Sequence, residues 1–142
     1  MFYGETVVTL NTLQDLAGLI RKQRKSLGIH IVTLAALANV SPKFISQLEN
    51  GKETIEVDAL LKVSHCLGIR LPLLDDRSLL AKKLREKRKA LNIEQAIAAS
   101  LCGVSPRFLS SIENAKEKKR LNKLFAVLKG FGFELEAEVR GN

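Results

Sequence analysis

The stretch Val40-Ser-Pro-Lys-Phe-Ile-Ser-Gln-Leu-Glu-Asn-Gly-Lys52 decides how this chain folds, because the chain contains it twice. Sixty-four residues later it reads Val104-Ser-Pro-Arg-Phe-Leu-Ser-Ser-Ile-Glu-Asn-Ala-Lys116, identical at eight of thirteen positions. In each copy a serine that can cap a helix precedes a proline, whose missing N–H loses nothing at the first helical position. The sequence therefore predicts the same short helix twice, beginning at Pro42 and at Pro106.

Each of these helices has an apolar side and a polar side. At 100° per residue the apolar side collects Phe44, Ile45 and Leu48, and in the second copy Phe108, Leu109 and Ile112. The other side carries hydroxyl, amide and cationic groups, namely Lys43, Ser46, Gln47 and Asn50 in the first copy and Arg107, Ser110, Ser111 and Asn114 in the second. Such groups bond to base edges and phosphates in a major groove. A merely solvated exterior is the alternative for one such helix, but the repetition favours the binding interpretation.

Composition and charge narrow the class of protein. A chain of 142 residues with 46% hydrophobic content can bury a core, and the repeat indicates two small domains. Aromatic residues are scarce, which disfavours a stacking platform for single strands. The net charge of +8 favours a polyanionic partner, with DNA, RNA and an anionic membrane as alternatives. Residues 75–142 carry fifteen Lys+Arg against nine Asp+Glu, whereas residues 1–74 carry eight against six.

Other chemistries have little support in the sequence. Cys66 and Cys102 occupy non-equivalent positions in apolar helical patterns, so we expect buried thiols and neither a disulfide nor a metal site. His30 is expected at the surface, and His65 as a packed or partly exposed helix residue. No paired carboxylates, nucleophile set or phosphate-binding glycine loop stands out, so we expect no enzyme and no cofactor. There is no membrane-length apolar run or secretory signal, and we expect a cytoplasmic protein without a membrane partner.

The flanking sequence predicts further helices around each repeat. Thr12 and Asp15 form a capping-box pattern that opens one helix, and Leu27-Gly28 ends it. A helix over Ile31–Ala38 and another over roughly Glu56–Leu67 complete the first copy. The inward residues expected in the second helices are Leu34, Leu37 and Ala38, and in the other copy Ala98 and Leu101. A helix, a tight turn at Asn39 or Gly103 and a capped second helix form a helix-turn-helix arrangement.

Short strands are expected at the ends of the copies. They cover Glu5–Leu10, Ile69–Leu73 and Phe133–Arg140, and Leu74–Asp76 is the linker, with an aspartate capping the next helix. The last strand alternates apolar and acidic residues, and it must pair because an isolated strand cannot satisfy its backbone. Its candidate partners are the first copy's strand, the N-terminal strand, or another chain in a homodimer.

One charged residue in each copy lies on an otherwise apolar stripe. Arg24 falls on the stripe of the first helix, and Glu49 borders the apolar side of the helix that begins at Pro42. Neither ion tolerates burial alone, so we expect Arg24 to pair with Glu49 and Arg88 with Glu113. These are structural pairs and not catalytic ones.

With this spacing the chain resembles two tandem λ-repressor-like helix-turn-helix domains of the XRE and Cro type. The residues that carry the resemblance are Ile20–Gly28, Leu34–Ser41 and Phe44–Lys52, with their second-copy equivalents. The strand before the first helix and the glycine-plus-strand ending are most similar to HipB-like antitoxins, in which terminal strands pair across a dimer. The resemblance implies a mainly α fold of two four-helix domains with short flanking strands, over residues 1–74 and 75–142.

The resemblance also implies roles for single residues. The base-reading candidates are Ser41, Lys43, Ser46, Gln47, Ser105, Arg107, Ser110 and Ser111. Arg107 suits guanine and Gln47 suits adenine. Gln95 takes the place of a phosphate-clamping amide, and the remaining phosphate contacts are Asn50, Lys52, Asn114 and Lys116.

The copies depart from the family pattern in different ways. In the first copy His30-Ile31 replaces the usual Thr-Gln, which removes a cap and a phosphate-binding amide. In the second, Ala115 replaces a glycine, so we expect Asn114 to take the left-handed conformation. The second copy also carries Lys116, Lys118, Lys119 and Arg120 beside the presumed DNA backbone. We therefore expect it to bind DNA more tightly, with the first copy shifted toward positioning or dimerisation.

Together these features predict a sequence-specific double-stranded DNA-binding regulator, a repressor, with two helix-turn-helix units in one chain. The alternative is an antitoxin that mainly binds and neutralises a toxin protein and uses DNA binding for autoregulation. The pattern is compatible with two assemblies. In one, a single chain with two helix-turn-helix units imitates a repressor dimer; in the other, two chains form a dimer that holds four such units.

Overall fold

The fold is mainly α-helical and repeats itself. The computed structural model describes residues 5–116 and 120–141. The first unit contains α1 (Leu13–Ser26), α2 (Ile31–Ala38), α3 (Pro42–Glu49) and α4 (Val57–Cys66). The second contains α6 (Arg77–Ala90), α7 (Gln95–Cys102), α8 (Pro106–Glu113) and α9 (Leu121–Gly130). Each helix lies 64 residues after its counterpart, and α5 (Pro72–Asp75) joins the two units. The prediction of a mainly α fold with tandem helix-turn-helix units is confirmed.

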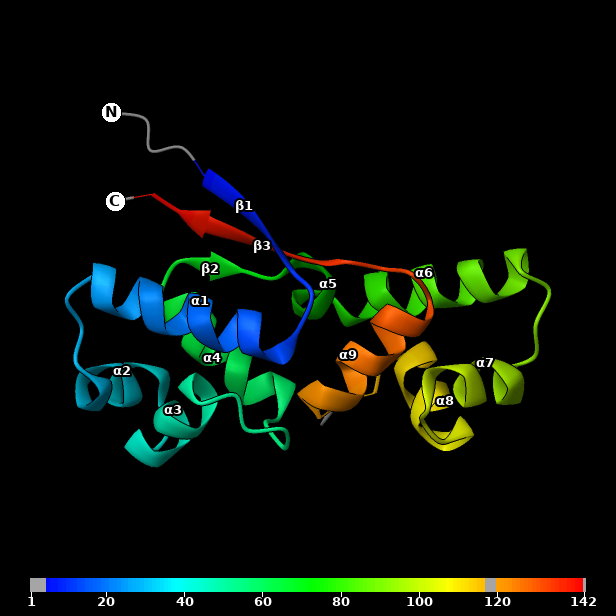
Figure 1. Ribbon diagram of the computed structural model, residues 1–142, viewed down its shortest axis with the longest axis horizontal. Coiled ribbons are helices and arrows are strands. Elements are labelled where there is room, and N and C mark those ends of the chain that lie inside the picture. Colours follow the sequence, from blue (N-terminus) through cyan, green and yellow to red (C-terminus); the bar gives the residue numbers. More distant parts are fainter. Residues whose placement is uncertain (1–4, 117–119, 142) are drawn as a thin grey trace.

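The two units lie side by side and share one small sheet (Figure 1). The sheet runs along the upper edge of the molecule in that view, and α2, α3, α7 and α8 lie along the lower edge. Both helices that the sequence repeats, α3 and α8, are therefore at the same edge, away from the sheet.

The long helices begin at side-chain caps that the sequence predicts. Thr12 accepts a bond from the Asp15 amide, and the Asp15 carboxylate accepts from the Thr12 amide, which makes a complete capping box for α1. Asp76 accepts from the Leu79 amide and starts α6 in the same way. These caps fix where each unit begins.

The last strand of the chain lies in the middle of the sheet and pairs with both other strands. The strands are β1 (Glu5–Leu10), β2 (Ile69–Arg70) and β3 (Leu135–Arg140), in the order β1-β3-β2 with antiparallel pairing. Leu10 lies opposite Leu135, and Ile69 lies opposite Val139. Two of the three candidate partners thus pair with β3 within the chain. Its backbone does not need another chain.

Two predicted strands are shorter than expected. β2 ends at Arg70 and not at Leu73, because Pro72 provides no ladder N–H and instead starts α5. The expected linker shortens for the same reason, since Leu74 is buried in the core and Asp75 ends α5. β3 begins at Leu135, two residues later than Phe133.

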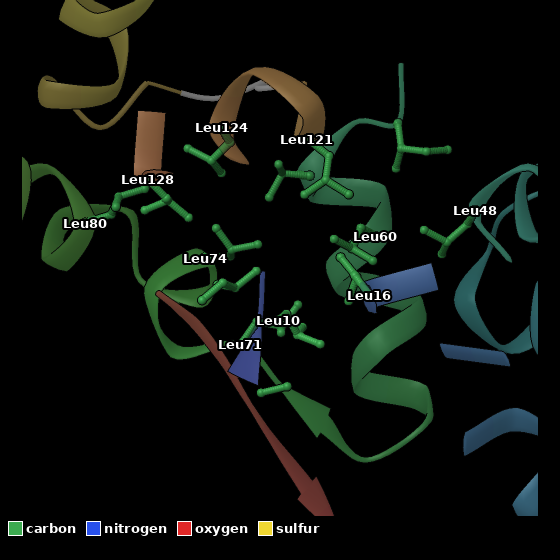
Figure 2. Packing of buried hydrophobic residues seen from close by; sticks show 14 of the residues in the cluster. Leu10, Leu16, Leu48, Leu60, Leu71, Leu74, Leu80, Leu121, Leu124 and Leu128 are labelled. Carbon is green, nitrogen blue, oxygen red and sulfur yellow. The ribbon is translucent and has the colours of Figure 1, made fainter. Parts of the chain in front are cut away.

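One hydrophobic core serves both units. Leu10 from β1, Leu74 from α5 and Leu121 from α9 are all almost fully buried in the same cluster. Figure 2 shows leucines of the cluster from both units and the sheet: Leu10, Leu16, Leu48, Leu60, Leu71, Leu74, Leu80, Leu121, Leu124 and Leu128. Because this cluster crosses the boundary between the copies, we expect the two units to unfold together.

Two leucines expected on inner faces, Leu37 and Leu101, are exposed. Leu37 and its counterpart Leu101 are 63% and 71% exposed, and Leu27 and Leu91 are also exposed. The buried side of α2 is Leu34, Ala35 and Ala38, which places Leu37 about 60° beyond its edge at 100° per residue. Small alanines allow α2 to approach α3 and α4 closely, and a leucine in their place would hold the helices apart.

Among the described residues, the cysteines and histidines belong to no metal-binding cluster. Both thiols are free and half-buried rather than fully buried, and burial raises the pKa of the Cys102 thiol. His30 is exposed, and the exposed His65 ring contacts Asp75, with 2.6 Å between Nε2 and Oδ1. Within the described ranges no group of three His, Cys, Asp or Glu residues is placed to hold a metal ion.

Among the described helices none is long and apolar enough to cross a membrane by itself, although α2 and α3 taken together pass that length and composition test across a 110° bend.

Replacement of Leu10 by alanine tests the shared core. Leu10 is 2% exposed, and a leucine-to-alanine change at such a site costs about 2–5 kcal/mol in the free energy of unfolding. We expect one cooperative urea transition at a lower midpoint, with both units lost together. The control is Val7→Ala on the exposed face of the same strand, for which we expect less than about 1 kcal/mol. Two separate transitions would contradict a shared core.

Candidate nucleic-acid interface

α3 and α8 are built and held in the same way. The Ser41 hydroxyl accepts a bond from the Phe44 amide at 3.0 Å, and the Ser105 hydroxyl accepts from the Phe108 amide at 3.1 Å. Pro42 and Pro106 occupy the first helical position. The undersides are buried through Ile45 and Leu48 in α3 and through Leu109 and Ile112 in α8, which leaves the polar side of each helix facing outward.

An arginine–glutamate pair ties each of these helices to the first helix of its unit. Arg24 donates two bonds to Glu49, with 2.6 Å from Nε to Oε2 and 2.9 Å from Nη2 to Oε1. Arg24 also donates to the Ile29 carbonyl at 3.0 Å, so the α1–α2 loop joins the same network. The hydrogen bond to Glu49 and its negative charge raise the pKa of the Arg24 guanidinium, against the opposing effect of burial.

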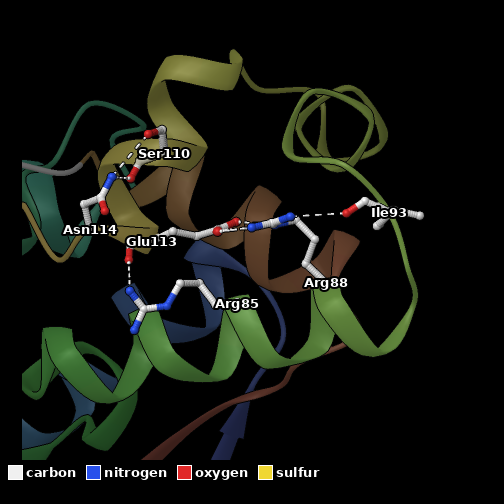
Figure 3. A network of polar contacts seen from close by, with 6 residues as sticks. All are labelled: Arg85, Arg88, Ile93, Ser110, Glu113 and Asn114. Atoms are coloured by element: carbon white, nitrogen blue, oxygen red, sulfur yellow. Dashed lines mark hydrogen bonds and ion pairs between the residues drawn. The ribbon is translucent and has the colours of Figure 1, made fainter.

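The second unit repeats this network (Figure 3). Arg88 donates to both Glu113 oxygens, with 2.9 Å from Nη2 to Oε1, and to the Ile93 carbonyl at 3.2 Å. Arg85 adds a bond to the Glu113 backbone carbonyl at 3.0 Å. The Glu113 side chain is only 2% exposed, so its charge depends on Arg88. The charges expected to pair thus lie together in both units.

The outward side of α3 carries unengaged polar groups. Lys43, Asn50 and Lys52 are exposed, and Ser46 and Gln47 are half-buried. Within the described part of the chain none of these five side chains takes part in a hydrogen bond or an ion pair. Their donors and acceptors are therefore available to a ligand.

The outward side of α8 is partly engaged. The Ser111 hydroxyl donates to the Phe108 carbonyl at 2.7 Å, and the Asn114 amide donates to the Ser110 carbonyl at 2.9 Å (Figure 3 shows the Asn114 contact). Arg107 and Lys116 are exposed and make no such bond among the described residues. Gln95, the expected phosphate clamp, is the first residue of α7 and half-buried. Arg107 is thus the main free group of α8.

Sequence reasoning missed one cation at this edge. Lys123 of α9 places its ammonium 5.6 Å from the centroid of the Phe108 ring, which holds a positive charge beside α8. Its counterpart in the first unit is Ala59, so the repeat itself gives no signal for this contact. Lys118 and Lys119, also expected here, lie outside the described residues.

The expectation for Asn114 is wrong. Ala115 itself takes the left-handed conformation with φ of 54°, and Asn114 has φ of −101°. Gly51 occupies the equivalent position with φ of 72°. The position after the C-cap reverses the chain, so the second copy retains the geometry and bears the strain of a Cβ there.

Comparison with protein families identifies this arrangement. A helix-turn-helix family model of the XRE and λ-repressor-like type matches residues 20–74 and again residues 84–137. The chain belongs to this helix-turn-helix family. No curated protein matches the chain. The resemblance to tandem helix-turn-helix domains is confirmed, and the narrower likeness to HipB-like antitoxins stays a prediction.

The two helix-turn-helix units meet around a pseudo-two-fold axis. Glu56 and Arg120 form an isolated antiparallel bridge, and these residues are equivalent in the repeat because they lie 64 positions apart. Beside them the Leu121 amide donates to the Ile55 carbonyl at 2.7 Å. Contact between equivalent residues in opposite chain directions is typical of a two-fold interface, so one chain reproduces the symmetry of a dimer.

Removal of one partner tests the ion pair. Arg88→Met leaves the Glu113 carboxylate buried without a cation, and we expect a loss of about 3–5 kcal/mol in the free energy of unfolding, measured with urea. Arg88→Met with Glu113→Leu should regain most of this loss, because no unpaired charge remains. The exposed neighbour Lys89→Met is the matched control. Equal stability of the Arg88 and Lys89 variants would contradict the role of the pair.

Replacement of Ala115 by glycine tests the strained turn. Glycine removes the strain of the left-handed alanine, but it also has more conformational freedom in the unfolded chain. The net effect should be a gain of about 0.5–1 kcal/mol in the free energy of unfolding. The reverse change, Gly51→Ala, should destabilise it, since Gly51 has φ of +72°, a left-handed conformation in which a Cβ is strained. Urea midpoints that do not move in opposite directions for the two variants would argue against strain at Ala115.

Proposed function

We propose that this chain is a sequence-specific regulator of transcription, a repressor, that places α3 and α8 in neighbouring major-groove segments of double-stranded DNA. The observation that carries the proposal is the outward polar side of each helix, with Lys43, Gln47 and Arg107 unengaged among the described residues. Membership of a DNA-binding helix-turn-helix family supports it.

The side chains divide into two kinds of contact. Gln47 carries a donor and an acceptor that suit the adenine edge, and Arg107 carries paired donors that suit the guanine edge. Ser41, Lys43, Ser46 and their counterparts complete the base-reading set. We assign Asn50, Lys52, Gln95, Asn114 and Lys116 to phosphate contacts, which set position and not sequence. The pseudo-two-fold axis supports a site with two inverted half-sites about 34 Å apart.

A second candidate is an antitoxin that holds a toxin protein. It is favoured by the exposed apolar side chains on the outer faces of α2 and α7, Val32, Leu37, Ile97 and Leu101. Protein interfaces use such side chains, although single exposed ones are common. Specific co-purification of a toxin, together with loss of its toxicity on co-expression, would favour this candidate. Capture of an operator without any such partner would favour the repressor.

The repressor proposal predicts a steep dependence of DNA binding on salt. Six to ten phosphate contacts lose about 10³- to 10⁵-fold in affinity between ~50 and ~200 mM salt. We expect a fall of this order for a duplex selected from a random pool, measured by fluorescence anisotropy. Constant affinity across this range would overturn the proposal.

Alanine variants locate the binding edge. Combined Lys43, Gln47, Arg107 and Ser110 replacements by alanine should lower affinity for the selected duplex at least about 100-fold, because four base-reading side chains are lost and two of them, Gln47 and Arg107, make bidentate contacts. The control replaces Arg70 and Lys83, two exposed cations that line pockets beside the sheet, and so removes the same charge. We expect that control to retain binding. Equal effects of the two variants would place the DNA elsewhere.

A further inference from the structure

The repeat allows the two reading helices to be compared position by position. Ser41, Ser46, Asn50 and Lys52 recur unchanged 64 residues later as Ser105, Ser110, Asn114 and Lys116. The outward residues that differ are Lys43, which becomes Arg107, and Gln47, which becomes Ser111. The first residue of the preceding helix also differs, Ile31 in α2 and Gln95 in α7. Two base-reading positions therefore carry different chemistry on the same scaffold.

The α3 side reads with the side-chain amide of Gln47. Gln47 offers a donor and an acceptor on one planar group, which matches the N7 and N6 edge of adenine. The side-chain amides of Gln47 and Asn50 make no hydrogen bond to another described residue. Lys43 adds a single mobile charge without a fixed fork of donors.

The α8 side reads with a guanidinium. Arg107 presents a rigid fork of N–H donors that matches the O6 and N7 acceptors of guanine. The Ser111 proton is already given to Phe108, and Asn114 is held by Ser110 at 2.9 Å to its carbonyl. Ser111 and Asn114 therefore lack the unengaged side-chain amide donors that Gln47 and Asn50 have in the first unit.

The fold prevents the units from exchanging places. They are joined through α5, and β1 pairs along its whole length with β3. The counterpart of β1 in the second unit, residues 69–74, forms β2 and part of α5 instead. The symmetry of the Glu56–Arg120 bridge is thus local, and the molecule has two distinguishable ends.

We propose that the chain recognises one unsymmetrical operator, in which an adenine-containing half-site lies under α3 and an inverted guanine-containing half-site lies under α8. One copy of the chain then binds in a single orientation, so the operator has a direction. This inference rests on the proposed function and adds to it which bases each unit reads.

Operators built from the selected sequence test the inequality of the half-sites. The selected duplex, with one half-site of each kind, is compared with two palindromes made by doubling either half-site. Each good bidentate contact discriminates by about 5- to 150-fold, so each palindrome should bind more weakly than the selected duplex by a factor in that range. Equal affinities for all three duplexes would overturn the inference.

Reciprocal variants test which residues assign the half-sites. Lys43→Arg with Gln47→Ser gives α3 the outward residues of α8 and should shift preference to the guanine-type palindrome. Arg107→Lys with Ser111→Gln should shift it to the adenine-type palindrome. All four changed positions are exposed or half-buried, so circular dichroism should show an unchanged fold. Unchanged preferences in both variants would overturn the assignment.

Single-residue variants test the orientation. Gln47→Ala should become insensitive to base changes in the adenine half-site while it stays sensitive to those in the guanine half-site, and Arg107→Ala should do the reverse. The single orientation would be overturned if a variant lost sensitivity equally in both half-sites, or if the selected site contained only one half-site. Neither result would contradict DNA binding itself. If the wild-type chain showed no sequence-selective duplex binding at all, the proposed function itself would fail.

Discussion

The bidentate bond between arginine and glutamate is the interaction on which each unit depends. It joins the last turn of α1 or α6 to the last turn of α3 or α8, and its extra bond to the Ile29 or Ile93 carbonyl fixes the following loop. A buried carboxylate without its cation would be costly, so the helix cannot rotate or slide without breaking the pair. This constraint keeps the apolar underside against the core and the polar side outward. The outward side of each helix is thus held in place by contacts on its inner side.

The second constraint is that the repeat is fused into one chain. The segment 69–76 both ends the first unit and begins the second, so it cannot form the full strand that each role would require. It is divided into β2, α5 and the Asp76 cap, and β1 pairs with β3 along the whole length of β3. The result is a molecule with a local two-fold axis at Glu56 and Arg120 and an unsymmetrical sheet. A local two-fold arrangement of the two units and asymmetry of the two ends thus coexist.

Most helices could be predicted because their signals are local. A serine or threonine cap, a proline at the first helical position and a glycine at the end act within a few residues, and α1 and both Ser-Pro helices begin at such signals. Errors arose where the decision depended on a neighbour in space. Leu37 and Leu101 have the right spacing for an inner face, but the close approach of α2 and α7 to their neighbours selects the alanines. Ala115 adopts a conformation that its residue type disfavours because the turn geometry requires it.

The sequence by itself determined the repeat, the caps and the polar and apolar sides of the two Ser-Pro helices, because each follows from periodicity and from residues close together in the chain. It also determined that two opposite charges on apolar stripes had to meet, because neither is stable alone. Only the tertiary structure decided that β3 pairs with both other strands, that one core spans both units, and which polar side chains of α8 are already engaged. These outcomes depend on contacts between residues far apart in sequence, whose free energies compete with one another only when the whole chain is assembled.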